Sequence, residues 1–151
     1  MPTVETTVFI HAPVEMVYDI AKDNKSFPLY MDDVKSLTVV EDEGDRIVSE
    51  WVGVISAFNV KVRWTQEDVW DPIGKTCTFK QVKGDYDSMD GTWSFTEERD
   101  GCRFNSVLHY EYTVPGLGAL VRKVVHGLVI KNMEAVLGAI KKRAEDKNRN
   151  S

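Results

Sequence analysis

The segment Leu117–Asp146, LGALVRKVVHGLVIKNMEAVLGAIKKRAED, is the only long stretch of this chain with sustained helical periodicity and no proline. At about 100° per residue, its polar residues Lys123, Lys131, Glu134 and Lys141 fall opposite one broad apolar face. That face comprises Leu117, Leu120, Val121, Val124, Val125, Leu128, Val129, Met133, Val136 and Ile140. The pattern predicts an amphipathic helix laid on a core.

Most of the chain before this helix is typical of strands, with β-branched and aromatic residues between short turns. A first strand ends before Pro13, which suits the first position of a short helix, and Phe27-Pro28 ends a second short turn. The expected strands are Val4–His11, Val34–Val40, Arg46–Ile55, Phe58–Trp70, Thr76–Val82, Met89–Thr96 and Arg103–Val114. Because the later connections are short, these strands should pair as an antiparallel meander.

The fold expected from these elements is a single α+β domain spanning residues 1–151, with a curved seven-stranded sheet wrapped around the long C-terminal helix. One helix covers only one face of a sheet, so the strands should alternate between an inner and an outer face. The inner face should carry all four tryptophans, Trp51, Trp64, Trp70 and Trp93. Such bulky side chains hold a helix away from the sheet, which leaves a cleft suited to an apolar ligand.

Charge and composition exclude several classes of function. The net charge is -5, and the lysines and arginines are scattered among acids, so a nucleic-acid partner is not expected. The sequence contains no signal-peptide pattern and no apolar run long enough to cross a bilayer, which favours a cytoplasmic protein without stable membrane insertion. Cys77 and Cys102 match no zinc or redox spacing and are expected to be reduced, half-buried strand residues.

Metal and cofactor chemistry finds no support in the sequence either. His11, His109 and His126 lack metal-ligand spacing, and we expect them at exposed or rim positions. Asp85 and Asp87, with Asp90, miss the register of a calcium loop. We therefore expect neither a metal nor a cofactor.

Three motifs resemble the START-like helix-grip superfamily (SRPBCC), in particular its polyketide cyclase/dehydrase and coenzyme Q-binding-like branch. They are the opening HAPVEMVYDIAKDNKSFPLYMDDVKSL, the mid-chain DGTWSF, and the terminal helix that follows VPGLG. The resemblance covers nearly the whole chain. It implies a deep hydrophobic cavity between sheet and C-terminal helix, with lipids, isoprenoids, polyketides or hormones as ligands, and it implies no single activity.

The residues expected to contact a ligand are those that periodicity directs inward from the sheet and the helix. They are Trp51, Trp64, Gln66, Asp68, Trp93, Phe95, Ser106, Leu108, Tyr110, Val125, Leu128 and Asn132. Asn132 and Asp68 interrupt apolar series, and an unpartnered buried amide costs about 1 to 3 kcal/mol. Either the ligand bonds to these two groups, or other protein groups and water do.

Two classes of function remain. In the aromatase/cyclases that the chain resembles, an arginine and a tyrosine help to position the polyketide, and Asp68 and Val34 stand at those positions here. A carboxylate cannot replace a guanidinium that stabilises an enolate. We therefore rank a carrier or chaperone for a small hydrophobic ligand above a polyketide aromatase/cyclase. A third candidate is a helper that presents a quinone or lipid to an enzyme, through transient contact with a membrane or a biosynthetic enzyme, as a monomer or a homodimer.

Overall fold

A computed structural model describes residues 2–55, 60–113 and 119–150 of the chain. In chain order the described elements are β1 (Thr3–Ile10), α1 (Val14–Lys22), the 3-10 helix η1 (Asn24–Leu29), β2 (Val34–Asp42), β3 (Arg46–Ile55), β4 (Val60–Asp71), β5 (Thr76–Gly84), β6 (Ser88–Glu98), β7 (Gly101–Glu111) and α2 (Ala119–Arg149). These elements confirm the expected α+β fold class. Three predicted elements end or begin at residues outside the described part of the chain, namely Phe58, Val114 and Leu117.

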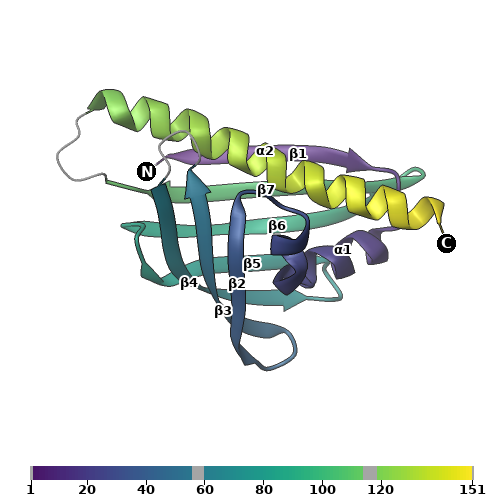
Figure 1. Ribbon diagram of the computed structural model, residues 1–151. Coiled ribbons are helices and arrows are strands. Elements are labelled where there is room, and N and C mark those ends of the chain that lie inside the picture. The colour runs from purple at the N-terminus through teal and green to yellow at the C-terminus, as the bar shows by residue number, and fades with distance from the viewer. Residues whose placement is uncertain (1, 56–59, 114–118, 151) are drawn as a thin grey trace.

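The seven strands form one antiparallel sheet in the order β1-β7-β6-β5-β4-β3-β2. Strands β2 to β7 are the expected meander, whereas β1 pairs with the last strand, with Thr3 opposite His109 and Ile10 opposite Cys102. In Figure 1, β1 and β7 run along the length of α2, whereas β2 and β3 run across it, so the sheet is strongly curved. Helices α1 and η1 carry the chain from one edge of the sheet to the other.

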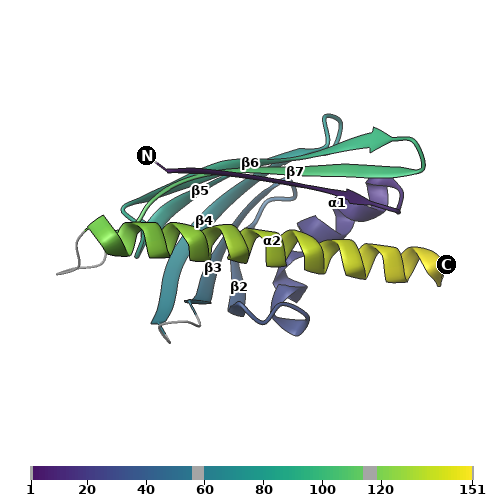
Figure 2. The ribbon, with the colours of Figure 1, turned by 90° about the horizontal axis from the view of Figure 1, so that it is seen from above.

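Helix α2 lies along the concave side of the sheet, packed against β1 and α1 (Figure 2). Apart from Ala119 and Leu120, whose side chains lie outside the described part of the chain, its buried positions are Val125, Met133, Leu137, Ile140 and Ala144. This face is rotated from the predicted one, which included Val124 and omitted Leu137 and Ala144. Val124 lies at the far edge of the predicted face and is 46% exposed. Asn132 is half-buried at the edge of the face and not near its middle.

Both prolines of the α1–η1 region differ from their expected positions. Pro13 caps α1 from outside, because the helix begins at Val14. Pro28 lies inside η1 instead of ending a turn. The backbone N–H groups of Tyr30 and Met31 both donate to the carbonyl oxygen of Phe27, and the Phe27 side chain is fully buried, so core packing holds a short 3-10 turn through the proline.

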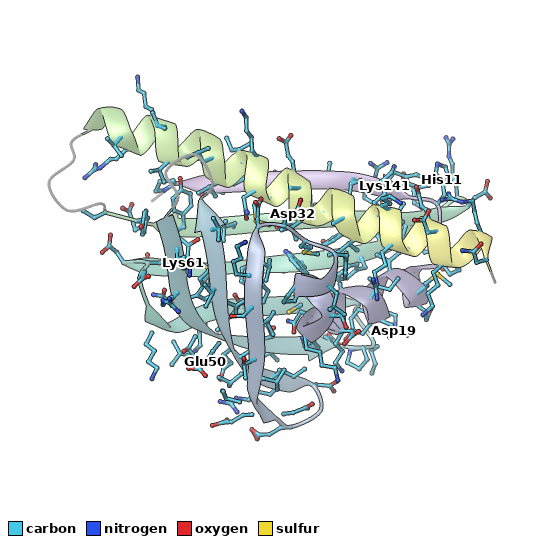
Figure 3. The ribbon with its side chains drawn as sticks, viewed as in Figure 1. His11, Asp19, Asp32, Glu50, Lys61 and Lys141 are labelled. Carbon is cyan, nitrogen blue, oxygen red and sulfur yellow. The ribbon has the colours of Figure 1, made fainter. Side chains whose placement is uncertain are left out.

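The alternation of the strands is as expected. Trp51, Trp70 and Trp93 are buried and Trp64 is half-buried, all on the inner face, while Lys61, Arg63 and Val69 of β4 are exposed. The same alternation would direct Ile55 and Val60 inward, but their side chains lie outside the described part of the chain. Figure 3 shows Lys61 and Glu50 away from α2, and Lys141 and His11 beside its C-terminal half, where the Lys141 ammonium donates to the Phe9 carbonyl oxygen.

The two cysteines are more buried than expected. Cys77 in β5 and Cys102 in β7 are both unpaired, and both are 1% exposed or less. The prediction of half-buried positions was therefore wrong. Both belong to the buried core cluster, and a small apolar thiol fits such close packing.

Gly91 is required by close packing within the sheet. A Cβ atom at this position would lie 2.3 Å from the Val107 carbonyl oxygen and 2.5 Å from the Phe79 ring. We predict that Gly91→Ala lowers the free energy of unfolding by about 1 to 3 kcal/mol, because the Val107 backbone and the Phe79 ring both have to move.

Gly138→Ala is the matched control, because Gly138 is exposed on α2 and a Cβ there meets nothing within 4 Å. It should raise stability by about 0.5 to 1 kcal/mol through helix propensity. Urea denaturation of both variants measures the two effects. Equal effects on stability would contradict the packing at Gly91.

Candidate functional site

A cavity of about 380 Å³ lies between the concave face of the sheet, α2 and η1. All four tryptophans contribute to its wall. Of the twelve residues predicted to contact a ligand, nine line it: Trp51, Trp64, Gln66, Asp68, Trp93, Leu108, Val125, Leu128 and Asn132. The alternation of the strands and the helical period therefore brought most of the predicted residues to one space.

Phe95, Ser106 and Tyr110 do not line the cavity. Phe95 stacks on Phe104 with ring centroids 4.6 Å apart. Ser106 accepts a hydrogen bond from the Trp93 indole at 3.1 Å. The Tyr110 hydroxyl is 2.8 Å from Nδ1 of His126, and the two rings are stacked. These three side chains face inward as expected, but they are packed into the core beside the cavity.

Several lining residues were absent from the predicted set. Trp70 was assigned to the inner face with the other tryptophans, and Met89 lies four residues before Trp93 on β6. The two-residue period of their strands could have added both to the set. Asn24 and Phe27 from η1 and Asp33 from the turn before β2 gave no such signal, because a turn has no period. The other lining residues that the prediction omitted include Val34, Gly53, Val62, Cys77, Phe79, Tyr86 and Tyr112.

Burial defines a floor and a rim of the cavity. At the floor, Phe27, Asp68 and Cys77 are each 1% exposed or less, and Asn24 and Trp70 are at most 4% exposed. At the rim, Asp33, Gly53, Val54 and Asn132 are half-buried, and Lys131 and Ala135 are exposed. A molecule that enters past the rim would meet increasingly enclosed walls toward Asp68.

A row of hydrogen bonds along β4 leads to the floor. The Trp64 indole N–H donates to Oε1 of Gln66 at 2.9 Å, and Nε2 of Gln66 donates to Oδ1 of Asp68 at 2.7 Å. Nδ2 of Asn24, from η1, donates to Oδ2 of Asp68 at 3.0 Å. The Asp68 carboxyl is therefore held by two amide groups, one on each oxygen. Sequence spacing placed Gln66 and Asp68 on the inner face but gave no sign of Asn24.

Desolvation dominates the ionisation of Asp68. Burial raises the pKa of its carboxyl from 3.8 to about 6, and the donors Gln66 and Asn24 limit the rise by stabilising the ionised form. The negative charge of neighbouring Glu67 adds a smaller increase. A carboxyl that titrates near pH 6 inside an apolar cavity can act as a hydrogen-bond acceptor or as a proton donor close to neutrality.

The raised pKa of Asp68 predicts a pH-dependent difference in stability between the wild type and Asp68→Asn. Between about pH 3.8 and pH 6 the unfolded wild type is ionised at this carboxyl while the folded protein still holds the proton. The wild type therefore loses stability relative to the variant as pH rises through this range, by roughly 2 to 3 kcal/mol. Chemical denaturation of both proteins across this range measures the difference. A difference that stays constant with pH would show that the Asp68 carboxyl is not desolvated.

Asn132 has a partner within the protein. Its Nδ2 donates to Oδ2 of Asp33 at 3.0 Å, which links α2 to the turn before β2 at the rim. The carbonyl oxygen of Asp33 in turn accepts from the backbone N–H of Val54 at 3.0 Å. The hydrogen bond to Asp33 satisfies one of the two N–H donors of the Asn132 amide. The assignment of Asn132 to ligand recognition therefore stays a prediction.

A metal site and a reactive thiol each place specific requirements on the remaining titratable groups of the described residues. Among the described residues, no three His, Cys, Asp or Glu side chains gather as a metal site requires. Burial raises the pKa of the Cys77 thiol far above its usual range, so this lining thiol is neutral. In the part of the chain that the structure describes, no helix is long and apolar enough to span a bilayer.

The curved antiparallel sheet, the long C-terminal helix and the enclosed apolar cavity define a START-like helix-grip protein. Residues 10–137 match the family described as polyketide cyclase / dehydrase and lipid transport. The chain belongs to this family.

Solved structures of related proteins have the same fold. A protein from Thermus thermophilus, TTHA0849, is 40% identical, with a TM-score of 0.89 over 95% of this chain and 97% of its own. The Zhui aromatase/cyclase from Streptomyces sp. R1128 is 18% identical, with a TM-score of 0.81 over 95% of this chain and 93% of its own. A STAR-related lipid transfer protein from Xanthomonas axonopodis is 14% identical, with a TM-score of 0.73 over 93% of this chain and 84% of its own.

Proposed function

We propose that this protein binds a small hydrophobic molecule in the cavity between the sheet and α2 and acts as its carrier or chaperone. The observation that carries the proposal is the cavity itself, about 380 Å³ in volume and walled by four tryptophans. Concave apolar spaces of this size that contain a few polar groups are typical ligand sites. Lipid transport in the family description supports the same reading.

The chemistry of the lining residues favours binding over catalysis. The lining residues that the structure describes include no serine, threonine or histidine, and their one thiol, Cys77, is held neutral by burial. A nucleophile paired with a base is therefore absent from this set. The carboxyl of Asp68, which stands where the resemblance to the aromatase/cyclases calls for arginine, is itself bonded to Gln66 and Asn24.

Binding of an uncharged fluorescent probe tests the proposal. N-phenyl-1-naphthylamine should bind saturably, with enhanced fluorescence, at one site per chain. Val129→Glu should weaken this binding about tenfold or more, because Val129 lines the cavity and a charge there would have to be desolvated. Fluorescence titration of wild type and variant measures the effect.

Val124→Glu is the matched control, because Val124 lies on the same helix but is exposed and is not part of the cavity wall. It should bind the probe as the wild type does. If both variants bind equally, the probe lies elsewhere. If the wild type does not bind the probe at all, the proposal fails.

A polyketide aromatase/cyclase is the second candidate function, and the observation that favours it is Asp68. A carboxyl with a pKa of about 6 in an apolar cavity can exchange a proton with a bound carbonyl compound near neutral pH. The structural likeness to the Zhui aromatase/cyclase supports the fold of such an enzyme alone, at 18% identity.

Native mass spectrometry separates a carrier from an enzyme. A carrier purified from its host should still hold a ligand. The mass of the ligand released by denaturation should equal the mass difference between the complex and the free protein. Adding the recovered ligand to fresh protein should then leave its mass and its absorption spectrum constant. Loss of water or a new aromatic absorption band, abolished in Asp68→Asn, would support the cyclase instead.

A further inference from the structure

The floor of the cavity has an unusual balance of charge. Among the described lining residues the carboxylates are Asp33 and Asp68, and the one cationic side chain is Lys131. Lys131 is exposed at the rim, whereas Asp68 is 1% exposed at the floor. A ligand that reaches the floor therefore meets a carboxyl group without a cation among the lining residues beside it.

Asp68 retains capacity to accept hydrogen bonds. Each carboxylate oxygen has two acceptor sites, and each oxygen of Asp68 accepts one bond, from Gln66 or from Asn24. The two amides fix the orientation of the carboxyl and leave one acceptor site on each oxygen. A ligand group with an O–H or N–H can use these sites, whereas an ether or ester oxygen cannot.

Trp70 adds a second polar group at the same end. It follows Asp68 by two residues on β4, so both side chains lie on the inner face, and both line the cavity. The Trp70 indole N–H is buried and has no hydrogen-bond partner among the described residues. A buried donor without a partner costs about 1 to 3 kcal/mol, so a ligand oxygen that reached this N–H would be stabilised.

From these observations we propose that the ligand enters with a neutral hydroxyl group first, as an apolar alcohol or phenol, and that Asp68 selects it against carboxylic acids. The inference rests on the proposed hydrophobic-ligand function and names the ligand class. A carboxylate head at the floor would lie next to Asp68, and two carboxylates that share an apolar site repel each other strongly. A hydroxyl instead gains a hydrogen bond to a charged acceptor.

Three naphthalene derivatives of similar size test the inference at neutral pH by displacing bound N-phenyl-1-naphthylamine. 2-Naphthol carries a hydroxyl donor, 2-methoxynaphthalene carries the same oxygen without the proton, and 2-naphthoate carries an anion. We expect 2-naphthol to bind about tenfold or more tightly than the ether. We expect 2-naphthoate to bind most weakly of the three.

Two variants test whether Asp68 causes the preference for a hydroxyl over a carboxylate. Asp68→Asn should reduce the advantage of 2-naphthol over 2-naphthoate by about tenfold or more, because the repulsion is removed. Glu67→Gln is the matched control: it removes a carboxylate from the next residue of β4, which is half-buried, pairs with Arg46 and is not part of the cavity wall. It should leave the ranking of the three compounds unchanged.

The displacement results distinguish failure of this inference from failure of the proposed function. Equal displacement by all three compounds would overturn the inference and leave the hydrophobic-ligand proposal standing. Tightest binding of 2-naphthoate, weakened by Lys131→Gln, would also overturn it, because the anion would then lie at the rim. Absence of binding by N-phenyl-1-naphthylamine itself would remove both proposals. If Asp68→Asn does not fold, the ranking on the wild type alone decides.

Discussion

The packing of α2 against one side of the curved sheet is the constraint on which the cavity depends. The helix packs chiefly along β1 and α1. The inner face there carries aromatic rings that pack on one another, such as Trp51 stacked on Trp64 at 5.5 Å and Trp93 edge-on to Phe104 at 5.1 Å. These contacts stabilise the wall, and Phe27 of η1 packs edge-on against Trp51 at its closed end. The space between wall and helix therefore stays open instead of collapsing into a core.

The polar floor is stabilised by its own hydrogen bonds, at a cost that an apolar residue would avoid. Asp68 is nearly fully buried, and removing a carboxylate from water is unfavourable even when amides bond to it. Asn24 brings η1 onto β4 through this carboxyl, so one interaction both closes the end of the cavity and orients its acceptor. A leucine would close the same end without desolvating a charge. The carboxyl at the floor therefore stabilises the fold less than an apolar residue would, which is consistent with the proposed role in ligand selection.

The sequence predicts the features that follow from the periodic spacing of apolar residues. It misses the features that follow from contacts between residues far apart in the chain. Alternation in β4 correctly directs Gln66 and Asp68 inward, because one face of each strand has to be buried. The helical period of α2 correctly predicts that Val125 and Met133 are buried. The exact direction of the buried face depends on where β1 and α1 pack, which the period does not specify, and Val124 is therefore exposed although it was predicted to be buried. Asn24 is the first residue of the short 3-10 helix η1, 44 residues from the carboxyl it bonds. No local pattern specifies that contact, nor the pairing of β1 with β7.

Exchange of the proposed ligand has to pass the rim, where the bond between Asn132 and Asp33 joins α2 to the turn before β2. Both side chains are half-buried, so water can replace this hydrogen bond when it opens, and its net contribution is about 0.5 to 1.5 kcal/mol. Burial of an apolar ligand contributes more, at about 25 cal/mol for each Å² removed from water. Retention of a ligand therefore depends chiefly on the aromatic wall and the floor, whereas the rim contributes a small barrier. A weak rim would suit the proposed carrier, because a ligand could then leave without rearranging the sheet.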